Sequence, residues 1–198
     1  MKKIMSYIVV LALICTLWTT AFAGSWVVPG PGGNGASDGN YYPSGISVRL
    51  IDDLSTRSGP STTYTECGTY RMKGQKVTVI SRAFDNGGVQ WAQVEITYGG
   101  AVRRMYTGVK RLDIGNSQLS RIPEEDMSYF IGYGTCNRTV NPKWGPGSYY
   151  ATYTDRTLRS GAQVAVIRSE NGYYQVEYYH TNGKVHRCWV PVENIDLN

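Results

Sequence analysis

Apolar and polar residues alternate over short stretches of the chain from about residue 45 onward. This period of two is typical of half-buried β-strands. Strands are expected within 73–80, 85–96, 160–167 and 170–178, because each range combines β-branched or aromatic residues with a glycine-containing turn. No amphipathic helix of useful length is indicated. The pattern therefore predicts an all-β protein.

The expected strands occur twice in the same order. The first copy runs from Arg57-Ser-Gly-Pro60 to a glycine turn and strand at 98–109, and the second from Lys143-Trp-Gly-Pro146 to 181–192. The offset between matching residues stays between 86 (Pro146 − Pro60) and 82 (Gln175 − Gln93). Such a repeat predicts two structural units of one kind, each a small β-barrel.

Glycine turns separate the strands within each copy. Asn86-Gly87 and Asn171-Gly172 are hairpin signals, because both residue types accept the positive φ of tight turns. The pairs Gly59-Pro60 and Gly145-Pro146 also predict turns, with glycine supplying an unusual φ and proline fixing the next residue. We therefore interpret these Gly-Pro loops as structural, and leave the tyrosine that ends each one, Tyr64 or Tyr150, open to function.

The domain organisation follows from breaks in this pattern. Residues 1–23 combine Lys2 and Lys3, an apolar run and an Ala-Phe-Ala end, which predicts a cleaved secretory signal peptide, with a retained anchor as the alternative. Residues 24–44 form a Gly/Pro-rich linker and 115–126 a polar one. The two barrels are expected at 45–114 and 127–198.

The order of motifs resembles the bacterial SH3 domain (SH3b, SH3-like type 3). Arg57-Ser-Gly-Pro-Ser61 carries it in the first copy, and 171–176 and 188–190 carry it in the second. The first copy departs at Ala92 and at Tyr106-Thr107, the second at Lys143-Trp144. The resemblance implies two tandem SH3-like barrels that do not catalyse a reaction and that bind a cell wall or a peptide.

Strand alternation assigns aromatic side chains to the polar face of each expected barrel. Trp91 shares its face with Gln93 and Glu95, and Tyr173 shares its face with Gln175 and Glu177, so we expect this face to contact solvent. Aromatic rings there could stack on a sugar or hold a peptide. The alternative is that the rings pack under a neighbouring loop. The candidate ligand-binding residues are Tyr64, Trp91, Tyr106, Tyr150, Tyr173 and Trp189.

The residues that could support catalysis are few. The chain has two histidines, His180 and His186, and neither belongs to a recognisable nucleophile–base–orienter set. We therefore expect no catalytic residues, no metal and no cofactor. After signal cleavage three cysteines remain, and an exported protein can form disulfides. A Cys136–Cys188 bridge is expected, because the first and last strands of a small barrel often meet, which leaves Cys67 as a thiol.

Charge narrows the choice of partner. The net charge of +5 falls to +3 when Lys2 and Lys3 are removed with the signal peptide, which is too weak to indicate nucleic acid. Sixteen tyrosines suit both strands and binding surfaces. The sequence thus predicts a secreted or cell-wall-associated binding protein, with peptidoglycan, another extracellular glycan or a peptide as partner. Insertion into the membrane after cleavage is not expected. The alternative function is a protein–protein adaptor or ligand-sensing module at the cell surface.

Overall fold

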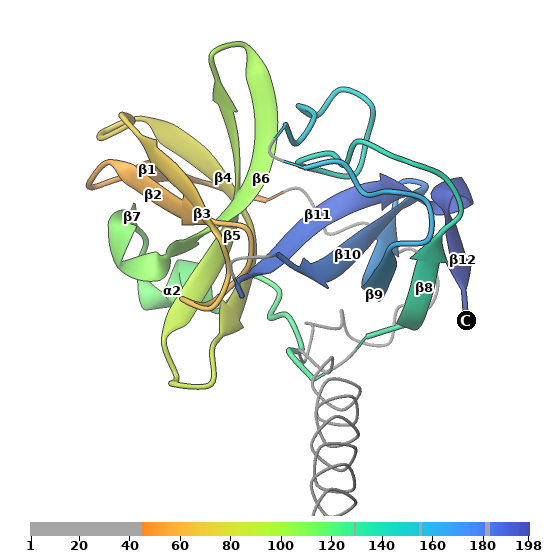
Figure 1. Ribbon diagram of the computed structural model, residues 1–198. Coiled ribbons are helices and arrows are strands. Elements are labelled where there is room, and N and C mark those ends of the chain that lie inside the picture. Colours follow the sequence, from red (N-terminus) through yellow and green to blue (C-terminus); the bar gives the residue numbers. More distant parts are fainter. Residues whose placement is uncertain (1–44, 129, 155, 181–182) are drawn as a thin grey trace, which may run out of the picture.

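The structure is a computed structural model that describes residues 45–128, 130–154, 156–180 and 183–198. The described chain is all-β, as predicted, and its strands form two antiparallel sheets that lie side by side (Figure 1). The predicted signal peptide and the linker at 24–44 lie outside the described residues. No helix in the described ranges has the length and apolar character needed to span a membrane.

The first sheet has the strand order β3-β2-β6-β5-β4-β1-β7. Its strands are β1 (Ile46–Leu50), β2 (Leu54–Arg57), β3 (Glu66–Tyr70), β4 (Lys76–Phe84), β5 (Gln90–Tyr98), β6 (Ala101–Gly108) and β7 (Leu112–Asp113). A 3-10 turn, η1 (Val109–Arg111), leads into β7, and a short helix, α2 (Asn116–Leu119), follows it.

The second sheet has the order β11-β10-β9-β8-β12. Its strands are β8 (Gly132–Cys136), β9 (Gln163–Glu170), β10 (Tyr173–Tyr179), β11 (Val185–Pro191) and β12 (Ile195–Leu197). A 3-10 turn, η2 (Val192–Asn194), precedes β12 just as η1 precedes β7. The antiparallel series β8-β9-β10-β11 therefore follows the same path as β1-β4-β5-β6 in the first sheet.

The two β-hairpins predicted from Asn-Gly pairs are both present. Asn171 (φ 50°) and Gly172 (φ 76°) join β9 to β10, which confirms that hairpin signal. The β4–β5 hairpin is also present, but its turn is longer than an Asn86-Gly87 pair would give. It spans Asp85 to Val89, and its residue of positive φ is Gly88 (φ 75°).

Each sheet encloses an apolar core, and the first core includes residues from the second half of the chain. Trp144 and Tyr153, which lie between β8 and β9, pack into the first core with residues such as Met105 and Leu54. The second core contains Val164, Val176, Val190 and their neighbours. The segment between β8 and β9 thus contributes to the packing of both halves.

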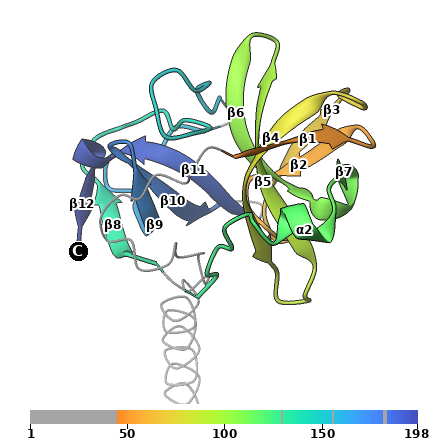
Figure 2. The same cartoon turned by 180° about the vertical axis from the view of Figure 1, so that it is seen from behind.

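Two reciprocal backbone contacts join the halves. Tyr64, at the end of the first Gly-Pro loop, forms a parallel bridge with Val185 of β11, and Tyr150, at the end of the second, forms one with Val102 of β6. Thr65 N donates to Val185 O at 2.9 Å, and Ala151 N donates to Val102 O at 3.0 Å. In both views β6 and β11 lie on the sides of the two sheets that face each other (Figures 1 and 2).

The glycine of each Gly-Pro loop has a different role from the expected one. Neither Gly59 nor Gly145 adopts a positive φ, so the expectation of an unusual backbone angle is wrong. A Cβ at Gly59 would lie 2.2 Å from Cδ1 of Tyr64, and one at Gly145 would lie 2.3 Å from Cδ1 of Tyr150. Glycine is required because a tyrosine ring lies directly against the backbone.

The predicted Cys136–Cys188 disulfide is absent, and both residues are free thiols. Strand β8 pairs with β12, so the residue opposite Cys136 is Ile195, while Cys188 on β11 lies opposite Val176 of β10. Both thiols are buried in the second core, where they pack as small apolar groups. Burial raises the pKa of each, and Cys136 raises that of Cys188 further.

Candidate functional site

The polar faces of the two sheets are buried against each other. Gln93, Gln175 and Glu177 are only 1–2% exposed, so the expectation that this face contacts solvent is wrong. Alternation correctly grouped these residues on one face, but each sheet's polar face is covered by the other half of the chain. Buried polar groups of this kind must be hydrogen bonded within the protein.

A tyrosine, a glutamate and an arginine meet at each of two points in this contact. At the first, Tyr64 Oη donates to Glu177 Oε1 at 2.7 Å, and Arg187 Nε donates to the same oxygen at 2.7 Å. Arg187 Nη2 also donates to Tyr64 Oη at 3.0 Å. Because Tyr64 comes from the first half and the other two from the second, this group holds the halves together.

The second group is the counterpart of the first. Tyr150 Oη donates to Glu95 Oε2, and Arg104 Nε donates to that oxygen at 2.8 Å. The members are offset from those of the first group by 86 (150 − 64), 82 (177 − 95) and 83 (187 − 104) residues. We call the two groups the Tyr-Glu-Arg clusters.

The first cluster extends into a larger buried network. Arg187 Nη1 donates to Tyr106 Oη at 3.0 Å, and Tyr106 Oη in turn donates to Glu125 Oε2 at 2.9 Å. Burial lowers the pKa of the Arg187 guanidinium, but Glu177, Tyr64, Tyr106 and Glu125 together outweigh burial and hold that pKa well above its usual value. Arg187 is therefore a permanent cation between buried carboxylates.

This arrangement removes four of the predicted ligand-binding residues from the surface. These four residues are exposed by no more than 2%. Tyr64, Tyr106 and Tyr150 each contact the other half of the chain, and Trp189 lies under Arg168, which hydrogen bonds to Gln93. The exposed surface of Tyr106, Tyr150 and Trp189 is too small for a direct ligand contact, whereas Tyr64 also lines a second cleft described below. Trp91 is 8% exposed and lines a surface cleft, and Tyr173 is partly exposed.

Trp91 is oriented by the turn that precedes it. Asp85 Oδ1 accepts hydrogen bonds from Gly87 N at 2.9 Å and Val89 N at 3.0 Å, while its Oδ2 accepts one from Trp91 Nε1 at 3.1 Å. One carboxylate thus fixes the β4–β5 turn and the indole together. The sequence marked this turn only as a hairpin, and gave no signal that Asp85 would also position Trp91.

The surface beside Trp91 forms a cleft of about 470 Å³, which we call the Trp91 cleft. Its walls come from β2, the first Gly-Pro loop, β5, β6 and η1. The lining residues are Ser55, Arg57, Thr62, Val89, Gln90, Trp91, Gly108, Val109, Lys110 and Arg111. The volume falls within the range of small-molecule sites.

The three cations of the cleft differ in how they are held. Arg57 Nη2 donates to Glu66 Oε1 at 2.7 Å, and Arg111 Nη1 donates to Asp52 Oδ2 at 3.1 Å. Lys110 is exposed and makes no ion pair with any described residue. A ligand can therefore recruit Lys110 without breaking a contact, whereas the two arginines mainly shape the wall.

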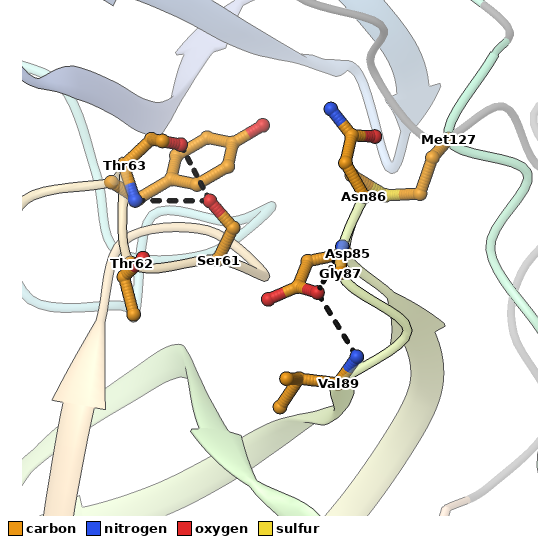
Figure 3. Close-up of a pocket in the computed structure, with 9 residues that line it drawn as sticks. Ser61, Thr62, Thr63, Asp85, Asn86, Gly87, Val89 and Met127 are labelled. Carbon is orange, nitrogen blue, oxygen red and sulfur yellow. Dashed lines mark hydrogen bonds between the residues drawn. The ribbon is translucent and has the colours of Figure 1, made fainter.

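A second cleft of about 340 Å³ adjoins the first and shares Thr62 and Val89 with it. Figure 3 shows the hydroxyl residues Ser61 and Thr63 on one wall and the turn from Asp85 on the other. Ser61 Oγ is hydrogen bonded to Thr63 Oγ1 and accepts from Thr63 N at 3.0 Å. Together the two clefts offer an indole, apolar contacts, hydroxyls and one available cation along a continuous stretch of surface.

His186 and Cys188, two residues apart on β11, are both buried. His186 Nδ1 is hydrogen bonded to Tyr153 Oη at 2.7 Å, and the ring stacks on Tyr178. Burial lowers the pKa of His186 to about 4, with smaller contributions from His180 and Arg156. Among the described residues, no group of three or more His, Cys, Asp or Glu side chains is placed to hold a metal ion.

Comparisons with known proteins give little further guidance. No family model matches the chain, and no match was found among curated proteins. Among solved structures, the chain is similar to NlpC2 from Trichomonas vaginalis, at 13% identity and a TM-score of 0.29, over 80% of this chain and 50% of that one. The chain thus spans about half the length of that protein. A likeness of this size establishes neither a shared fold nor a shared activity.

Proposed function

We propose that the chain is a secreted, non-catalytic binding protein built from two SH3-like barrels, and that it holds an extracellular glycan or peptide in the Trp91 cleft. The matching strand paths of the two sheets and the reciprocal Tyr-Glu-Arg clusters support the tandem arrangement. The signal-peptide pattern of residues 1–23 supports secretion.

The observation that carries the proposal is that Trp91, with its indole fixed by Asp85, lines a surface cleft. An indole fixed by Asp85 offers a rigid apolar surface with little loss of conformational freedom on binding. Val89, 53% exposed, extends that surface, and Thr62 supplies polar atoms at the junction with the second cleft. Sugars and peptides both present apolar faces next to polar groups, which this lining suits.

Co-sedimentation with purified peptidoglycan tests the proposal. Val89→Asp places a negative charge in the cleft, and a bound ligand would bury that charge. We expect the variant to bind at least tenfold more weakly, because a tenfold loss needs only about 1.4 kcal/mol. Leu197→Asp is the matched control, since Leu197 is 47% exposed on β12, outside both clefts.

Three results would overturn the proposal. Wild type remaining in the supernatant excludes the wall polymer as partner and favours the adaptor alternative. Equal binding by Val89→Asp and wild type excludes the Trp91 cleft. Equal losses in Val89→Asp and Leu197→Asp show that added negative charge, and not the cleft, determines binding.

A further inference from the structure

A separate pocket of about 730 Å³ lies on the second sheet, far along the chain from the Trp91 cleft. The loop before β9 forms most of it, and the end of β10 completes it. The lining residues are Thr154, Arg156, Thr157, Leu158, Arg159, Ala162, Gln163, Tyr178 and Tyr179. We call it the arginine pocket.

The charged side chains in the described lining of the arginine pocket are both cationic. Its described lining includes Arg156 and Arg159 and no acidic side chain. Among the described residues neither arginine forms an ion pair, in contrast to Arg57, Arg82 and Arg104 of the first sheet. Two guanidinium groups that share a pocket without carboxylate partners raise the local potential and favour an anion.

The other lining residues provide the surroundings that an organic anion needs. Leu158 is buried and Ala162 half-buried, so part of the wall is apolar. Tyr178 and Tyr179 line the pocket from the end of β10, and Thr154 and Gln163 add exposed polar residues to its lining. The volume lies in the range that holds a whole small molecule, which exceeds what a lone inorganic ion would fill.

We propose that the arginine pocket binds a small organic phosphate, with the phosphate group held by Arg156 and Arg159 and the carbon skeleton against Leu158 and the tyrosine rings. The guanidinium fork matches the spacing of phosphate oxygens and forms two parallel charge-assisted hydrogen bonds. The site is independent of the Trp91 cleft, so either proposal can fail without the other.

A titration of the isotope-labelled protein with glycerol 3-phosphate, followed by amide chemical shifts, tests this proposal. We expect saturable shifts at Arg159, Ala162 and Tyr179, with a dissociation constant of about 1 mM or tighter. Glycerol, which lacks the phosphate, should produce none. Glycerate, which carries a carboxylate on a similar skeleton, should bind at least tenfold more weakly.

Variants separate the pocket from general surface charge. Arg156→Gln/Arg159→Gln should weaken glycerol 3-phosphate binding at least tenfold, while Arg121→Gln, an exposed arginine outside the pocket, should bind as wild type. If the double variant does not fold, Arg159→Gln alone serves, because Arg159 is exposed. Shifts that do not saturate, glycerate binding as tight as glycerol 3-phosphate, or an equal loss in Arg121→Gln would overturn the proposal.

Discussion

The buried network around Arg187 yields the most demanding prediction. Arg187 is 3% exposed and lies between Glu177 and Glu125, which are 2% and 3% exposed. The change Arg187→Ala removes the cation and leaves two buried carboxylates without it. Breaking a buried ion pair by removing one partner costs about 3–5 kcal/mol. For a chain of this size, about 2–4 °C is lost per kcal/mol, so the melting temperature should fall by roughly 6–20 °C.

Thermal unfolding at pH 7 measures this loss, and Arg121→Ala is the control. Arg121 is exposed and makes no ion pair within the described ranges, so its replacement should change stability by less than about 0.5 kcal/mol. The gap between Arg187→Ala and wild type should also narrow as the pH falls toward 5. Burial raises the pKa of Glu177, and loss of the guanidinium removes the charge that opposes this shift, so protonation at lower pH relieves the uncompensated charge. A melting temperature within about 2 °C of wild type would refute the reasoning.

Two further predictions follow from single contacts. Gly59→Ala forces the Tyr64 ring off the backbone, since the new Cβ would lie 2.2 Å from Cδ1, and should cost about 1–3 kcal/mol in chemical denaturation. Gly115→Ala, with 3.9 Å to its nearest neighbour, should cost far less, and equal losses would contradict the packing argument. Because the pKa of His186 falls from 6.5 to about 4 on folding, the unfolded chain binds more protons between these values and stability rises with pH there. Unfolding free energy should be about 2 kcal/mol lower at pH 5 than at pH 7, and His186→Gln should flatten this dependence; an unchanged profile would show that other groups cause it.

The sequence predicted which residues form strands better than it predicted what covers the faces of those strands. Period-two alternation identified the β4, β5, β9 and β10 strands, and Asn171-Gly172 identified a hairpin, because these depend on local geometry. Alternation also grouped Trp91, Gln93 and Glu95 correctly. It could not reveal what covers that face, since the cover comes from residues more than fifty positions away, such as Tyr150 and Arg168.

One signal for the buried contact was present in the sequence. A tyrosine, a glutamate and an arginine recur at matching places in both copies, as Tyr64 and Tyr150, Glu95 and Glu177, and Arg104 and Arg187. A sheet face that repeats charged residues and aromatic rings can pack against a second such face, or it can line an exposed groove. The pattern therefore fits both arrangements. The two clefts and the arginine pocket left no such trace, because each joins side chains from separate loops and strands.

The central claim is that ligand binds beside Trp91 and not at the tyrosines of the Gly-Pro loops. Amide and indole chemical shifts of the labelled protein, recorded during titration with soluble peptidoglycan fragments, test it most directly. If the ligand binds in the Trp91 cleft, we expect saturable shifts of the Trp91 indole N–H and of the Thr62, Val89 and Lys110 amides, which all belong to the cleft. Saturable shifts confined to other surfaces, or none at all, would contradict it.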